Sequence, residues 1–110
     1  MPKLCTFNDN KMDFLTQYNA QIAELCRKYN VRRLYAFGSV LTDRFNAESD
    51  IDLEVDIADE NPLEYADNYF NLKFSLLDLF KRPVDLLEHK AIRNPLMRKH
   101  IDNSKQLIYG

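Results

Sequence analysis

Hydrophobic and acidic residues alternate from Asp50 to Ile57, which is the most regular pattern in the chain. The apolar positions are Ile51, Leu53, Val55 and Ile57, and each intervening position holds Asp or Glu. Because successive side chains of a β-strand point to opposite sides, the pattern predicts a strand with one apolar and one acidic face. The short apolar run Leu34–Phe37 predicts another strand, over Val31–Phe37, which stops at Gly38-Ser39.

Spacings of three and four residues predict the helices. Such a spacing over about residues 11–30 predicts an amphipathic helix, which Asn30 can end because Asn tolerates the left-handed conformation. Asn61-Pro62 and Asn94-Pro95 each combine a capping side chain with a proline in the first turn. We therefore expect helices from Pro62 to about Phe80 and over roughly residues 95–103, and a short helix from Ser39.

The remaining segments complete the predicted fold. Val84–Glu88 predicts a third strand, and Lys105–Tyr109 is an apolar ending whose type the pattern leaves open. The order helix, strand, strand, helix, strand, helix predicts an α+β fold: a small mixed β-sheet with helices packed on it.

The predicted helix that starts at Pro62 carries two apolar stripes. One consists of Ala66, Phe70, Phe74 and Leu77, and the other of Tyr65, Tyr69, Leu72, Leu76 and Leu79. A helix with one buried face needs only the first stripe. Either the helix is wedged into the core on a wide face, or the Tyr65–Leu79 stripe docks a partner or a second copy of the chain.

Composition limits the possible functions. A length of 110 residues fits one small domain, residues 1–110, and a net charge of −2 argues against non-specific binding of nucleic acid. No apolar segment is long enough to cross a bilayer and no signal-peptide pattern is present, so we expect a cytoplasmic protein. Cys5 and Cys26 lack partners at metal-binding spacing and are expected to be reduced thiols.

The acidic face of the Asp50–Ile57 strand is the candidate chemistry. Asp50 and Asp52 are neighbours on this face, and two ionised carboxylates so close repel each other unless a cation lies between them. Carboxylate oxygens suit Mg²⁺, which completes its shell with water and substrate phosphate. Gly38, without a Cβ, allows a sharp turn and the close approach of a ligand.

Gly38-Ser39, a gap of ten residues, and then Asp50-Ile51-Asp52 resemble the motif of the nucleotidyltransferase superfamily that includes DNA polymerase beta. In detail the chain is similar to the minimal nucleotidyltransferases, which are encoded beside helical HEPN proteins in toxin–antitoxin pairs. The resemblance extends from about residue 12 to the closing Leu-Ile-Tyr-Gly. Asp85, in Val-Asp-Leu-Leu, falls where this family carries a third carboxylate.

The resemblance implies a metal-dependent transfer of AMP from ATP to a hydroxyl of a HEPN toxin, with this chain as the antitoxin. It implies that Asp50, Asp52 and Asp85 hold two Mg²⁺ ions and that Asp85 takes the proton of the nucleophile. Gly38 and Ser39 would bind the triphosphate at the start of a helix, where free N–H groups and the helix dipole favour anions. The charge balance and small size favour a protein acceptor over a nucleic acid. A homo- or hetero-oligomer fits the resemblance too.

Two positions depart from the family pattern. Family members often carry Arg shortly after Gly-Ser, and here Arg44 is the nearest cation and takes that place in the expected nucleotide site. Glu54 stands where the family commonly has an apolar residue. We expect Glu54 to lie in solvent at the far end of the strand, with a role in metal binding as the alternative.

Other interpretations account for less of the pattern. An EF-hand loop needs a Gly that residues 50–55 lack, and sugar-nucleotide transferases with Asp-x-Asp are usually larger than this chain. A contact-only antitoxin acting through the Tyr65–Leu79 stripe stays open, as does nucleotide transfer to a small molecule. His89 and His100 are expected at the surface. A basic cluster, Lys81, Arg82, Lys90, Arg93, Arg98 and Lys99, is either a solvated face or a surface that meets phosphate or an acidic partner.

Overall fold

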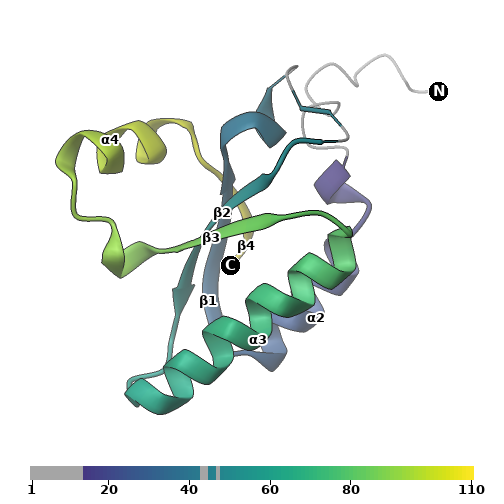
Figure 1. Cartoon of the computed structure of the whole chain (residues 1–110). Coiled ribbons are helices and arrows are strands. Elements are labelled where there is room, and N and C mark those ends of the chain that lie inside the picture. The colour runs from purple at the N-terminus through teal and green to yellow at the C-terminus, as the bar shows by residue number, and fades with distance from the viewer. Residues whose placement is uncertain (1–13, 43–44, 47) are drawn as a thin grey trace.

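A computed structural model describes residues 14–42, 45–46 and 48–110. The elements follow the predicted order (Figure 1). They are α2 (Asn19–Lys28), β1 (Val31–Phe37), the short 3₁₀ helix η2 (Gly38–Leu41), β2 (Ile51–Ile57), α3 (Pro62–Phe80), β3 (Val84–Glu88), the 3₁₀ helix η3 (His89–Ala91), α4 (Pro95–Ser104) and β4 (Gln106–Tyr109). The predicted α+β fold is confirmed, and the C-terminal segment whose type the sequence pattern left open forms the strand β4.

The four strands form one mixed sheet in the order β3-β2-β1-β4. β1 pairs antiparallel with both β2 and β4, whereas β2 and β3 are parallel. α2 and α3 lie together on one side of the sheet, and α4 stands on the other side (Figure 1). The sheet thus has one face for the core and a second face, on the side of α4, where His89 of η3 and Lys105 lie against Glu54 of β2.

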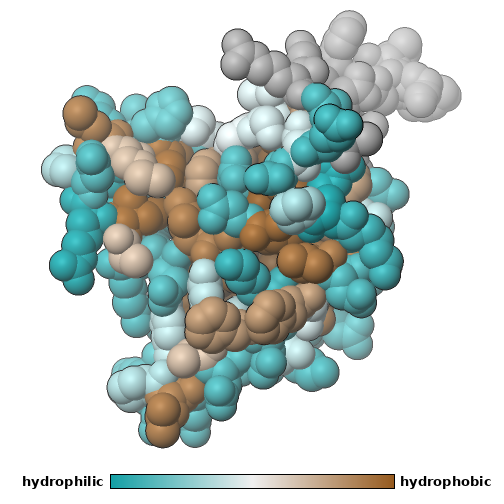
Figure 2. Space-filling model, in the orientation of Figure 1, coloured by the Kyte–Doolittle hydropathy of each residue, from teal (hydrophilic) through white to brown (hydrophobic). Residues whose placement is uncertain are grey.

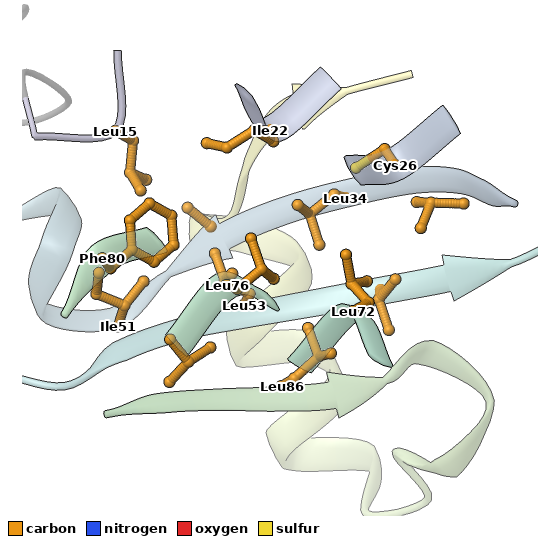
Figure 3. Packing of buried hydrophobic residues seen from close by; sticks show 14 of the residues in the cluster. Leu15, Ile22, Cys26, Leu34, Ile51, Leu53, Leu72, Leu76, Phe80 and Leu86 are labelled. Carbon is orange, nitrogen blue, oxygen red and sulfur yellow. The ribbon is translucent and has the colours of Figure 1, made fainter. Parts of the chain in front are cut away.

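The core lies between the sheet and the pair α2–α3 (Figure 3). Leu53 of β2 and Leu86 of β3 are opposite each other in the sheet, and both are buried. Leu72 and Leu76 of α3, each with no exposed surface, pack against this layer, and α2 adds Ile22 and Cys26. Each fully buried aliphatic side chain stabilises the fold by roughly 1.5–3 kcal/mol.

The ends of the helices follow from their capping residues. The Asn61 side chain accepts hydrogen bonds from the backbone N–H groups of Leu63 and Glu64, and Asn94 caps α4 in the same way. Asn30 has a φ of 60°, as predicted for a residue that ends a helix. Within the predicted helix over residues 11–30, residues 14–16 are helical, residues 17–18 form a turn and α2 begins at Asn19. Residues 11–13 lie outside the description.

The contact-only hypothesis needs the Tyr65–Leu79 stripe of α3 to be exposed, but this stripe is the one that faces the core. In the Tyr65–Leu79 stripe, Leu72 and Leu76 are fully buried and the other three members pack against the core, so this stripe is no docking surface. In the other stripe, Phe70, Phe74 and Leu77 are exposed, and the rings of Phe70 and Phe74 stack. Figure 2 shows hydrophobic residues on this face of α3.

The described cysteine is chemically quiet. Cys26 is a free thiol with no exposed surface, and burial raises its pKa to about 12. A thiol with such a pKa is protonated at neutral pH and a poor nucleophile or metal ligand. Cys5 lies outside the described residues. No helix in the part of the chain that the structure describes has the length and apolar character needed to cross a membrane.

The assignment of the two stripes predicts opposite results for two truncations. Leu76→Ala removes a fully buried side chain and should lower the free energy of unfolding by about 2–5 kcal/mol. Phe74→Ala removes a largely exposed ring and should change it by less than about 1 kcal/mol. Urea unfolding followed by circular dichroism measures both, and a larger loss for Phe74→Ala would contradict the assignment.

Candidate active site

The pairing of β2 with its two neighbours brings the candidate site together. Asp52 is opposite Phe37, the last residue of β1, and opposite Asp85 of the parallel strand β3. Paired residues of adjacent strands point to the same side of a sheet, so Asp52 and Asp85 lie side by side on the face away from α3. Asp85 is exposed, and Asp52 is half-buried. Asp85 therefore neither points into the interior nor lies far from Asp52.

Gly38 meets the carboxylate of Asp52 at the end of β1. Its φ is +78°, a backbone conformation that residues other than glycine rarely adopt, and a Cβ at this position would overlap Oδ2 of Asp52. The backbone of residue 38 therefore passes directly beside the Asp52 carboxylate. η2, which starts here, has only four residues, so its dipole is much weaker than the resemblance suggested. Bare backbone and the Ser39 side chain are what this turn offers to a ligand.

The carboxylates of the site repel one another. Burial raises the pKa of Asp52, and the charges of Asp85 and then Asp50 raise it further. None of the three carboxylates forms an ion pair or a side-chain hydrogen bond with another described residue. Three acidic groups without a cationic partner are a suitable donor set for a hard cation such as Mg²⁺.

The three side chains are not, however, arranged as a finished metal site. Among the described residues, no three His, Cys, Asp or Glu side chains form a group that could hold a metal ion. The strands bring the three aspartates together, while the carboxyl groups themselves are not gathered around one point. The donor chemistry fits Mg²⁺, and the roles of Asp50, Asp52 and Asp85 as its ligands stay predictions.

Arg82 holds the loop that leads into Asp50, and the sequence pattern gave no sign of this. Its guanidinium lies 4.6 Å and 4.7 Å from the ring centres of Phe14 and Phe45. It also donates hydrogen bonds to the backbone carbonyls of Asn46 and Ser49, at 2.9 Å and 3.0 Å. Arg82 therefore fixes the backbone one residue before Asp50. Only the Pro that follows Arg82, a break after a helix, marked this region in the sequence.

Glu54 does not lie in solvent, contrary to our expectation. It is the buried acidic residue of β2, with no exposed surface, because η3 and Lys105 cover this part of the sheet. Its Oε2 lies 2.6 Å from Nδ1 of His89 and 3.4 Å from Nζ of Lys105, while Oε1 has no partner among the described residues. Because the covering residues are 35 and 51 positions away, the alternation of β2 alone could not reveal the burial.

Lys105 gives this buried carboxylate its counter-charge, and the ring of His89 gives it a hydrogen-bond partner. Burial acts against the charged form of Lys105, but hydrogen bonds to Asp102 and Glu54 outweigh it and raise the Lys105 pKa. The ammonium group also lies 4.1 Å from the ring centre of Tyr35. The side chain of His89 is 41% exposed, in line with the expected surface position, but its ring also contacts the buried Glu54, which the sequence did not indicate. His100 is exposed as predicted.

Two predicted features change with the structure. Arg44, expected to contact the nucleotide, lies outside the described residues, so its position stays a prediction. The basic cluster of the sequence separates into two groups. Lys81 and Arg82 lie between α3 and β3, and Lys90, Arg93, Arg98 and Lys99 belong to the segment from η3 to α4.

Comparison with known proteins shows what this chain resembles. The family model described as Polymerase beta, Nucleotidyltransferase matches residues 20–110. A protein of Methanocaldococcus jannaschii named "Putative protein adenylyltransferase MJ1379" is 37% identical over 82 residues, which cover 74% of this chain and 79% of that protein.

Solved structures share the fold. A "putative minimal nucleotidyltransferase" superposes with a TM-score of 0.70 at 23% identity, covering 86% of this chain and 93% of that chain. A complex of a tri-AMPylated HEPN toxin of Shewanella oneidensis with an MNT antitoxin matches with a TM-score of 0.59 at 19% identity. That match covers 86% of this chain and 71% of the other.

The repulsion around Asp52 predicts that Asp52→Asn raises the melting temperature at neutral pH in a buffer without divalent cations. A raised folded-state pKa means that ionised Asp52 costs stability. This loss of stability is absent at a pH below the unfolded-state pKa of about 3.9 and complete at a pH above the raised folded-state pKa. The difference in melting temperature between Asp52→Asn and the wild type should therefore disappear on acidification. Thermal melts across this range measure the difference, with the exposed Asp67→Asn as control; a lower melting temperature for Asp52→Asn at pH 7 would contradict the account.

The burial of Glu54 predicts a large loss of stability in Glu54→Ala. The substitution leaves Lys105 without its counter-charge and His89 without its hydrogen-bond partner, and breaking such a buried ion pair typically costs about 3–5 kcal/mol. Glu60→Ala, at an exposed position, is the matched control and should stay within about 0.5 kcal/mol of the wild type. Equal unfolding free energies for the two variants in urea would show that Glu54 is not held as described.

Proposed function

The chain belongs to the Polymerase beta nucleotidyltransferase family, and from this premise we propose that it transfers AMP from ATP to a hydroxyl group of a HEPN-type protein. It is a nucleotidyltransferase, and its relative in M. jannaschii carries the name of a protein adenylyltransferase. One solved neighbour is an antitoxin bound to an AMPylated HEPN toxin, which supports the same acceptor class here. We propose the role of antitoxin in the cytoplasm, where ATP is available.

One observation carries the proposal. Asp52 is paired with Asp85 on one side and has the backbone of Gly38 against its carboxylate on the other. This places two acidic side chains beside a turn that offers backbone groups and the hydroxyl of Ser39, the two kinds of group that phosphoryl transfer needs. A face that was merely solvated would not require glycine at residue 38.

The residues of the chain divide the work as follows. The backbone of Gly38 and the hydroxyl of Ser39 bind the phosphates of ATP, and Arg44 adds a positive charge to them. The acceptor oxygen attacks the α-phosphorus, the bond from this phosphorus to the bridging oxygen of the β-phosphate breaks, and pyrophosphate leaves. Asp85, the exposed carboxylate, accepts the proton of the acceptor hydroxyl. The products are the AMP ester of the acceptor and pyrophosphate.

Mg²⁺ completes the proposed site. Asp50, Asp52 and Asp85 would hold two ions, which when bound offset the negative charge that develops at the reacting phosphate. The aspartates in turn lose the mutual repulsion that raises the pKa of Asp52. The loop held by Arg82 keeps Asp50 at the edge of this group.

The proposal predicts that Asp50→Asn combined with Asp52→Asn abolishes the labelling of a HEPN-type acceptor protein. With ATP labelled in the α-phosphate, the wild type should label that protein in the presence of Mg²⁺ and lose the activity in EDTA. Glu60→Gln, a carboxylate-to-amide change at an exposed residue away from the site, should label at the wild-type rate. Persistent labelling by the double variant would show that these aspartates do not form the site.

A further inference from the structure

We propose that residues 89–101 form the docking surface for the acceptor protein and that they recognise an acidic surface on it. These residues, which we call the arm, comprise η3 and most of α4. The inference rests on the proposed function, because it concerns the protein that receives AMP. It adds the surface that binds this protein and the charge that the protein must present.

The first step is the position of the arm beside the carboxylates. His89, its first residue, binds Glu54, and Glu54 is the next residue after Asp52 on the same face of β2. Two residues along a strand span about 6.6–6.8 Å. The arm is also fixed internally, because Arg98 donates hydrogen bonds to the carbonyls of His89 and Ile92, at 2.7 Å and 3.0 Å. A protein bound to the arm would therefore lie next to the carboxylates.

The second step is how little of the arm is packed. Only Ile92 and Ile101 are buried among its residues, and α4 stands apart from α2 and α3 on the other side of the sheet (Figure 1). Near the start of α4, Leu96 is 79% exposed and Met97 is 45% exposed. Exposed aliphatic side chains on a rigidly tethered helix are typical of protein-binding surfaces.

The third step is charge. The arm contains Lys90, Arg93, Arg98 and Lys99 and no Asp or Glu, although the whole chain has a net charge of −2. Arg98 is occupied by the carbonyls of the arm itself. Arg93 and Lys99 are exposed and form no ion pair or hydrogen bond with another described residue. A cationic surface of this kind attracts an acidic partner and orients it.

Both the charge and the apolar side chains favour a protein over other ligands. Nucleic acid binding gains from cations but has little use for Leu96 and Met97. The ATP phosphates have their place at Gly38 and Ser39, on the far side of Asp52 from Glu54. An acidic protein surface satisfies Arg93 and Lys99 and covers the aliphatic side chains at the same time.

Charge reversal at the two unpaired cations tests the proposal. The variant combines Arg93→Glu with Lys99→Glu, and the matched control combines Arg27→Glu with Lys28→Glu on α2. Calorimetry measures the affinity of each for the HEPN-type acceptor protein and, separately, for ATP with Mg²⁺. We expect the arm variant to lose about tenfold or more in affinity for the HEPN protein, with a weaker dependence on salt, while its affinity for ATP is kept.

Four outcomes would overturn the proposal: unchanged HEPN binding, an equal loss in the control, a parallel loss of ATP binding, or a shift in self-association by ultracentrifugation. The third would assign the arm to the triphosphate, and the fourth to a second copy of the chain. A second variant, Leu96→Ser, changes no charge and should weaken HEPN binding as well. Because binding is measured without turnover, failure of AMP transfer would sink the proposed function but leave this test intact.

Discussion

The hydrogen-bond register of β2 is the constraint on which the candidate site depends. β2 lies between an antiparallel neighbour, β1, and a parallel neighbour, β3, and is fixed by both. A shift of one residue in a strand moves every side chain to the other face of the sheet. Such a shift would turn Asp52 toward the core and Leu53 away from it. The apolar face therefore protects the position of the acidic one, since Ile51, Leu53, Val55 and Ile57 are all buried.

The two faces of the sheet carry different tasks. On one side, α2 and α3 enclose a continuous hydrophobic core, and the side chains that β2 contributes to this core are all apolar. On the other, three aspartates of β2, β3 and the loop before β2 remain close enough to repel one another. The core thus stabilises a fold whose opposite face is electrostatically unfavourable without a cation. Natural sites of catalysis often hold such locally unfavourable arrangements.

Sequence patterns predicted most of the strands and helix starts, because capping residues and strict alternation are local signals. The faces of α3 were predicted wrongly, since both arrangements expected from the sequence buried the stripe that contains Phe70 and Phe74. Because both stripes are apolar, periodicity alone could not show that Leu72 and Leu76 fit the sheet while the two rings stay exposed. Glu54 and Arg82 were beyond local signals altogether. Their partners, Lys105 for Glu54 and the carbonyl of Asn46 for Arg82, come from distant parts of the chain. The backbone turn at Gly38 and a short helix after it were predicted, but the 3₁₀ form of η2 was not.

The buried carboxylate of Glu54 also has an evolutionary consequence. An aliphatic side chain at residue 54 would leave the partly buried Lys105 without a counter-charge and His89 without its hydrogen-bond partner, and loss of Lys105 would leave the buried carboxylate without a cation. We therefore expect evolution to replace Glu54, His89 and Lys105 together, or one at a time through an intermediate sequence with a less stable fold. Homologues should therefore fall into discrete groups at these positions, with few mixed combinations, even where the remaining surface varies freely.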